Sequence, residues 1–357
     1  MNMLDKVIDN AEKFATEYGM KAPIFLGPMA GACPVNLSAA VANGGGMGAC
    51  GALLMKPDAI LKWADDFRNQ TDGPFQLNLW IPDAAPKRDE AHENELRAFL
   101  NKWGPEVSKD AANGTPPNFD EQCQALLEAN PHVISSIMGV FDTDYVSQMK
   151  AKGIKWFANA STVAEALAAE AAGADVIVAK GMEAGGHSGN FSPELAARQA
   201  VGTLSLTTGI VDAVNIPVIA TGGISDARTA LATLMLGASG VQIGTGFLRA
   251  PEAGISTAWA SAIGQTAPED TILTRAFSGR YGRSIATKYA LAMEADDAPT
   301  AAPYPVQRGL SQVMRDTGAK ENNIDCIQAW AGQSARLAQN ISATTITQNL
   351  WSEMKSA

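Results

Sequence analysis

Short apolar runs alternate with amphipathic segments along most of the chain. The runs are rich in β-branched side chains and too short for helices, which is typical of strands buried on both faces of a parallel sheet. The expected strands are residues 24–30, 46–54, 75–81, 133–139, 155–161, 174–179, 216–223 and 240–248. Eight such units, each separated from the next by helical sequence, predict a closed (β/α)8 TIM barrel rather than an open doubly wound sheet.

The alternating pattern stops after residue 250. Residues 251–320 combine a helical stretch, a basic segment and a proline-rich connection, so we expect a small helical cap domain there. Residues 1–250 would then form the barrel, and residues 321–357 would form C-terminal helices that pack on it. Residues 82–120 are polar and proline-rich, which predicts an excursion with a surface helix rather than core.

Composition narrows the functional classes. The chain has 357 residues, 46% of them hydrophobic, and a net charge of −10. So acidic a chain has no overall attraction for nucleic acid or for an anionic membrane. The N-terminus is charged from Asp5 onward and lacks the apolar stretch of a signal peptide, so we expect a cytoplasmic protein. Either a monomer or a homodimer is expected. The four cysteines lack CxxC spacing and no HExxH motif occurs, so no metal site is expected.

A glycine-rich run, KGMEAGGHSG, occupies residues 180–189 at the C-terminal end of an expected strand. Gly185 and Gly186 carry no Cβ, so backbone can approach a flat or anionic ligand closely. His187 lies within this run, and a neutral imidazole is well suited to moving a proton near pH 7. A single histidine is more often structural, but its place at a glycine-rich strand exit favours a functional role. Lys180 would approach either a ligand or solvent.

The next two strand exits, ATGGIS (220–225) and IGTGFL (243–248), also contain glycine turns. In this barrel class, backbone N–H groups at these two exits commonly hold phosphate. The expected donors are Gly222, Gly223, Gly244 and Thr245, whereas Ser225 and Asp226 are better suited to capping the following helix. A phosphorylated cofactor would therefore lie across strands six to eight.

Two earlier strand exits suit a conjugated ring. Pro28 and Met29 present backbone and a soft thioether, although methionine at a strand end is about as often simple packing. Gln76 and Asn78 share one face of their strand by the period of two, and an amide such as Asn78 inside a barrel can both donate to and accept from a flavin edge. Flavin mononucleotide (FMN) fits this arrangement.

Several motifs together resemble the nitronate monooxygenase family, also called the 2-nitropropane dioxygenase family. They are FLGPMAG (25–31), GMEAGGHSG (181–189), VIATGGISDAR (218–228), SGVQIGTGFL (239–248), FSGR (277–280), PYPVQRGL (303–310) and AWAGQSARLA (329–338). The resemblance implies an FMN-dependent enzyme that oxidises alkyl nitronates with O2 to a carbonyl compound and nitrite. It also implies His187 as the catalytic residue. The implied FMN contacts are Met29, Asn78, Gly185, Gly223 and the Gln242 to Thr245 run.

The chain departs from the family at two positions. Many members have glutamine at the position of Lys180, and some have a second histidine at the position of Ile137. In the expected cap, the candidates to contact an anionic substrate are Tyr304, Arg308 and Lys288, together with Arg280 and Arg283. Two other functions stay open. One is an FMN-dependent enoyl reductase or NAD(P)H:quinone reductase of the same superfamily, and the other is a non-catalytic flavin-binding barrel.

Overall fold

The computed structural model describes residues 2–357, and its largest element is a barrel of eight parallel strands. These are β1 (Ile24–Leu26), β2 (Gly48–Gly51), β3 (Phe75–Trp80), β4 (Val133–Ile137), β5 (Lys155–Ala160), β6 (Val176–Lys180), β8 (Val218–Thr221) and β9 (Gly240–Ile243). β1 pairs with β9, and a parallel bridge between Phe25 and Met47 joins β1 to the start of β2. The sheet therefore closes on itself, as the alternating pattern predicted.

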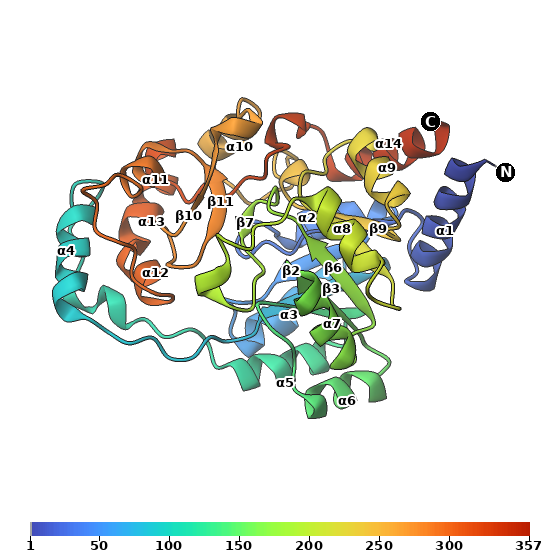
Figure 1. Ribbon diagram of the computed structural model, residues 1–357, viewed down its shortest axis with the longest axis horizontal. Helices are drawn as coiled ribbons and strands as arrows, with labels where there is room; N and C mark the ends of the chain where they lie inside the picture. Colours follow the sequence, from blue (N-terminus) through green and yellow to red (C-terminus); the bar gives the residue numbers. More distant parts are fainter. Residues whose placement is uncertain (1) are drawn as a thin grey trace.

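Helices surround this barrel (Figure 1). They are α2 (Val35–Asn43), α3 (Pro57–Arg68), α5 (Phe119–Ala129), α6 (Thr143–Ala151), α7 (Val163–Ala171), α8 (Thr203–Val211) and α9 (Ala227–Met235). Asp226 accepts a hydrogen bond from the Thr229 backbone N–H and so caps α9, as expected. No helix within residues 2–357 is long and apolar enough to cross a membrane.

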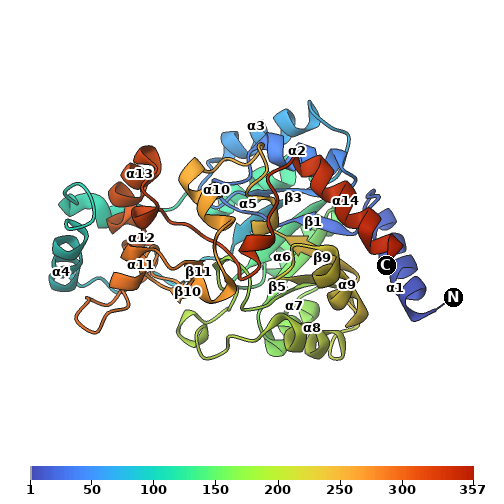
Figure 2. The same cartoon turned by 90° about the horizontal axis from the view of Figure 1, so that it is seen from above.

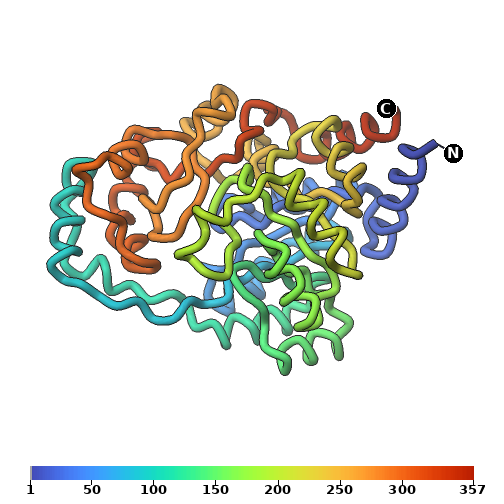
Figure 3. Tube along the Cα trace, viewed as in Figure 1, coloured from blue at the N-terminus to red at the C-terminus, as the bar shows by residue number. Residues whose placement is uncertain are grey.

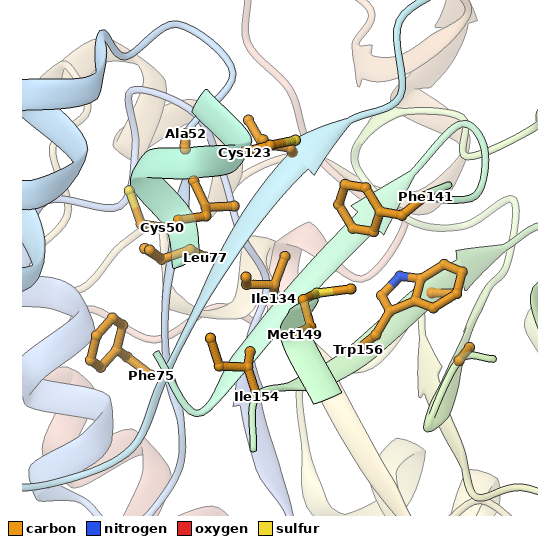
Figure 4. Close-up of a cluster of buried hydrophobic side chains, with 14 of the residues drawn as sticks. Cys50, Ala52, Phe75, Leu77, Cys123, Ile134, Phe141, Met149, Ile154 and Trp156 are labelled. Carbon is orange, nitrogen blue, oxygen red and sulfur yellow. The ribbon is translucent and has the colours of Figure 1, made fainter. Parts of the chain in front are cut away.

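The outward and inward faces of the strands form different layers. On the outward face, side chains such as Leu77, Ile134 and Trp156 pack under α3, α5 and α6 (Figure 4). On the inward face, apolar residues such as Phe25 and Phe157 fill the N-terminal end of the barrel. Polar side chains occupy the C-terminal end of the interior. Gln76 and Asn78 do share one face, so the period of two correctly placed both inside.

The two chain ends lie together on the side of the barrel away from the cap (Figures 1 and 2). α1 (Met3–Glu17) places Phe14 and Tyr18 against Phe25 and Phe157, which closes the N-terminal end of the barrel. The C-terminal helix, α14 (Ala343–Ser356), packs on α2 and α9.

The cap projects from one side of the barrel (Figure 2). It contains α10 (Thr257–Ile263), β10 (Thr271–Thr274), β11 (Gly282–Ile285), α11 (Lys288–Ala292), α12 (Val306–Leu310) and α13 (Gln312–Glu321). β10 and β11 form an antiparallel pair, so the structure adds a sheet to the expected helices.

Residues beyond β3 also join the cap. The chain leaves the barrel, forms α4 (Glu90–Leu100) beside α12 and returns to α5 (Figure 3). Leu96 and Leu100 are fully buried against cap residues such as Phe277 and Leu310. The expectation that residues 82–120 lie outside any core is therefore wrong for α4, because its apolar face needs a partner and the cap supplies one.

Candidate active site

A cavity of about 440 Å³ opens at the C-terminal ends of the barrel strands and extends under the cap. Fourteen of the seventeen sequence-predicted site residues line it. They are Pro28, Met29, Asn78, Lys180, Gly185, Gly186, His187, Gly222, Gly223, Gln242, Gly244, Thr245, Tyr304 and Arg308. These residues come from the C-terminal ends of five strands, β1, β3, β6, β8 and β9, and from the cap, and the barrel topology brings them together.

The exits of β8 and β9 contribute backbone donors. The N–H groups of Gly223, Gly244 and Thr245 have no acceptor among the described residues. Gly222 and Gly223 have φ angles of +112° and +70°, a region that glycine enters without steric cost. Thr245 begins a short 3₁₀ turn (Thr245–Phe247), and the first N–H groups of such a turn have no acceptor within it. This corner of the cavity therefore suits an anionic group such as a phosphate.

Side-chain amides form the floor of the cavity. The Gln76 side chain donates to the carbonyl oxygen of Leu26 and to Oε1 of Gln242, and the Asn78 side chain donates to the backbone and hydroxyl oxygens of Ser135. These bonds fix the amide planes, so Asn78 and Gln242, which line the cavity, present defined polar edges to it, whereas Gln76 is fully buried and does not line it.

Lys180 ends β6 and reaches into the cavity. Its only polar contact is with the carbonyl oxygen of Gly185, at 3.5 Å, and it forms no salt bridge with the described residues. Loss of hydration lowers the pKa of its amine to about 8. Glu183, in the following loop, accepts hydrogen bonds from the backbone and hydroxyl of Thr203, so it holds the loop rather than pairing with His187.

His187 lies in β7 (Gly186–His187), which pairs with β11 of the cap (Figure 1). Its Nε2 atom lies 2.6 Å from the hydroxyl of Ser278. The rings of Trp80 and Trp330 contact the imidazole edge-on, with centroid distances of 4.6 and 4.8 Å. The ring is thus held by a barrel strand, a loop and the cap at once.

The protonation state of His187 follows from these surroundings. Loss of hydration lowers its pKa well below the usual value of 6.5, and the positive charge of Arg308 lowers it further. The imidazole is therefore neutral at pH 7. The Ser278 hydroxyl donates either to Nε2 or to the carbonyl oxygen of Arg280, 3.3 Å away. In the second arrangement Nε2 carries the proton, and Nδ1 keeps the lone pair that a base needs.

The cap contributes side chains that have no partner in the protein. The guanidinium group of Arg308 lines the cavity and has no acceptor among residues 2–357. The hydroxyl of Tyr304 is buried and likewise unpaired in the described structure. Burial lowers the pKa of Arg308 and raises that of Tyr304. A guanidinium nevertheless stays charged in proteins, and a phenol is neutral at pH 7. An anion with acceptor oxygens would satisfy both groups.

The other cationic candidates do not line the cavity. Lys288 is 76% exposed and forms a salt bridge of 2.7 Å with Asp325, which removes it from the substrate candidates. Arg280 pairs with Asp83, and Arg283 donates to the carbonyl oxygen of Met182. These two arginines therefore join the cap to the barrel.

Sequence reasoning missed several residues around the imidazole. Trp80, Trp330 and Asn159 line the cavity, and Ser278 bonds to His187. Ser278 and Trp330 lie in the motifs FSGR and AWAGQ, which carry the family resemblance, so a signal was present for these two. Their contact with His187 was not readable, because each is far from it in sequence.

Comparison with known proteins identifies the family. The family profile described as nitronate monooxygenase matches residues 12–353. The chain belongs to the nitronate monooxygenase family. A relative from Staphylococcus saprophyticus, named probable nitronate monooxygenase, is 34% identical over 342 residues, covering 93% of this chain and 94% of the relative. A relative of the same name from Staphylococcus aureus is 34% identical and covers 96% of each chain.

Solved structures agree with this family membership. Nitroalkane oxidase from Streptomyces ansochromogenes superposes with a TM-score of 0.87 at 30% identity, covering 97% of this chain and 98% of that one. FabK from Thermotoga maritima superposes with a TM-score of 0.75 at 28% identity, with 96% of each chain covered. The protein is therefore a TIM-barrel oxidoreductase of the nitronate monooxygenase family.

Proposed function

We propose that the protein is an FMN-dependent nitronate monooxygenase that uses O2 to convert alkyl nitronates to a carbonyl compound and nitrite. The observation that carries this proposal is the unpaired guanidinium of Arg308, which lines the same cavity as the neutral imidazole of His187. A nitronate is a small anion with two acceptor oxygens, and a cation beside a neutral base is suited to binding it.

The residues present fit FMN. The unpaired N–H groups of Gly223, Gly244 and Thr245 would hold the phosphate, because they are donors without acceptors in the described structure. Asn78 and Gln242 would offer amide edges to the ring, and Pro28 and Met29 would contact its face. When bound, the flavin would supply the electron acceptor that the oxidation needs.

Arg308 and Tyr304 would bind the substrate's nitro oxygens. Arg308 is charged and Tyr304 has a free hydroxyl, so together they would orient the anion and offset its loss of hydration. If a neutral nitroalkane enters, His187 would remove its α-proton, since a neutral imidazole is a base. If a nitronate enters, His187 would orient the anion instead.

Trp80 and Trp330 would protect this chemistry from solvent. Both contact the imidazole edge-on, and Trp80 also contacts the ring of Tyr304 at 5.4 Å. These contacts would restrict the orientation of the imidazole, and the two indoles would reduce the amount of water around it, which strengthens electrostatic interactions with a bound anion.

The test is to purify the protein with its flavin and measure O2 consumption and nitrite release with an alkyl nitronate. We expect a yellow protein that turns over without NADH or NADPH. The reductase alternative predicts rapid bleaching of the flavin by NADH or NADPH under nitrogen. A flavin-loaded protein that bleaches in this way, and does not consume O2 with nitronates, would contradict the proposal.

A further inference from the structure

A second, smaller cavity lies behind Lys180. Its volume is about 20 Å³, enough for one ordered water molecule. Its walls come from the end of β5, the loop after β6, residues 199–201 before α8, and Leu273 of β10. Lys180 also lines the large cavity. Its side chain therefore forms part of the wall between the two spaces.

Polar groups around the small cavity lack partners. Asn190 is 3% exposed, and its Nδ2 atom has no hydrogen-bond acceptor among the described residues. The hydroxyl groups of Ser161 and Ser188 also line the space and bond to no other described residue. Leaving a buried amide donor unpaired is unfavourable, and a bound water would satisfy it.

We propose that an ordered water fills this cavity, links Asn190 to the Lys180 amine, and lets that amine exchange protons with solvent from behind the flavin cavity. Gln199 and Ala200, which are partly exposed, form the outer wall through which the exchange occurs. The inference rests on the proposed function only in taking the large cavity as the flavin and substrate site.

Proton exchange with solvent would allow the Lys180 amine to gain a proton when an anion binds. Because loss of hydration lowers its pKa to about 8, part of the amine is neutral at pH 8. An anion that enters the large cavity favours the charged form and raises this pKa, so the amine takes up a proton. That proton arrives through the water in the small cavity. Binding of the anion and proton uptake are thereby coupled.

Other ionisable groups surround Lys180, and none forms a salt bridge with it in the described structure. Glu165 at the start of α7 accepts from the backbone N–H groups of Ser161 and Phe191. Glu183 is bonded to Thr203. The remaining groups are His187 on β7, Asp316 of α13, and the cap residues Arg280, Arg308 and Arg315, the three arginines whose charges also act on His187. Lys180 is the only one of these groups that lines both cavities.

The first test measures proton uptake when sodium nitrate, a planar monovalent anion, binds to the FMN-loaded protein. Calorimetry in buffers of different ionisation enthalpy gives the number of protons. We expect uptake of up to about half a proton near pH 8, falling toward zero near pH 6, because Lys180 is already charged there. Lys180→Met and Lys180→Gln should abolish it. Proton uptake by His187 would increase toward low pH, because burial and nearby positive charges lower its pKa, and this opposite trend separates the two groups.

The second test fills the small cavity. Gly189 lines it, and an added Cβ would lie 2.9 Å from the Ser161 hydroxyl oxygen and 3.4 Å from Cδ of Lys180, at a φ angle that alanine adopts. Gly189→Ala should displace the water, lower the pKa of Lys180 further, and move the uptake maximum by about one pH unit to lower pH. Gly114→Ala is the matched control, since its Cβ would meet no atom within 4 Å.

A high-resolution crystal structure should show the water in the small cavity, and its loss in Gly189→Ala. The proposal would be overturned if proton uptake persists in both Lys180 variants, or if the pH dependence of proton uptake in Gly189→Ala matches that in Gly114→Ala. Neither result depends on turnover. A failure of the proposed function would instead appear as a lack of O2 consumption with nitronates.

Discussion

The two sides of the large cavity are built from different chemistry. The barrel side presents main-chain N–H groups at glycine turns, as at Gly223 and Gly244, together with amide edges. The cap side presents long side chains, above all Arg308 and Tyr304. Backbone donors bind any suitably placed anion, whereas a guanidinium and a phenol can be exchanged by mutation for groups of other size and charge. We infer that the barrel sets cofactor affinity and the cap selects the substrate.

The largest effect is expected at His187, which joins the two sides. His187→Asn keeps a polar side chain but removes the base, so we expect kcat/KM for a neutral nitroalkane to fall by about 100-fold or more. The rate of O2 consumption at different nitroalkane concentrations gives kcat/KM. The flavin content should stay normal, because His187 is not among the proposed phosphate donors. Unchanged turnover with both neutral nitroalkanes and nitronates would remove the catalytic assignment.

The next effect tests the cap side alone. Arg308→Met removes a charged hydrogen bond worth about 1.5–3 kcal/mol, so KM for a nitronate should rise by about 10- to 100-fold. FMN binding should not change. Lys288→Met is the matched control, since Lys288 is exposed and paired with Asp325. If the two variants behave alike in steady-state assays, Arg308 does not contact the substrate.

A smaller effect is expected on the barrel side. Gly223→Ala places a Cβ at a φ angle of +70°, which costs about 1–3 kcal/mol and shifts the backbone donor. We expect FMN to bind about tenfold more weakly in a fluorescence titration, with KM unchanged once the site is saturated. Gly114→Ala serves again as the control. A rise in KM at saturating FMN would mean that the two sides are not independent.

The smallest expected effect is that of the Arg308 charge, on the cap side, on the pKa of His187. Activity with a neutral nitroalkane requires uncharged His187, so it should rise with pH through an apparent pKa below 6.5. Arg308 opposes protonation of the imidazole. Replacement of Arg308 by methionine should therefore raise that apparent pKa, so that activity falls at a higher pH than in the wild type. If the apparent pKa of activity is unchanged in Arg308→Met, the charge of Arg308 does not affect the pKa of His187.

The difference between the barrel side and the cap side also explains which features of the site could be predicted from the sequence. Strand positions and glycine exits are local features, so the barrel and its backbone donors were predictable from spacing alone. The inward direction of Asn78 followed from the period of two. These predictions need only the neighbours of a residue along the chain.

The cap could not be predicted in this way. Ser278 and Trp330 reach His187 from 91 and 143 positions away, and no periodicity encodes that contact. Lys288 and Arg308 look equivalent in the sequence as cations of the expected cap, yet only Arg308 lines the cavity. α4 was expected at the surface because its partner is supplied more than 170 residues later in the chain.

The pairing of β7 with β11 has a consequence for engineering. His187 lies opposite Gly282 of β11 in the sheet, and the next residue, Ser188, donates its backbone N–H to the carbonyl oxygen of Tyr281, so the cap helps to set the orientation of the imidazole. A cap transplanted from another member of the family would bring a new pocket and would also redirect the imidazole. Chimeras should therefore exchange residues 186–187 and 282–285 as a single unit.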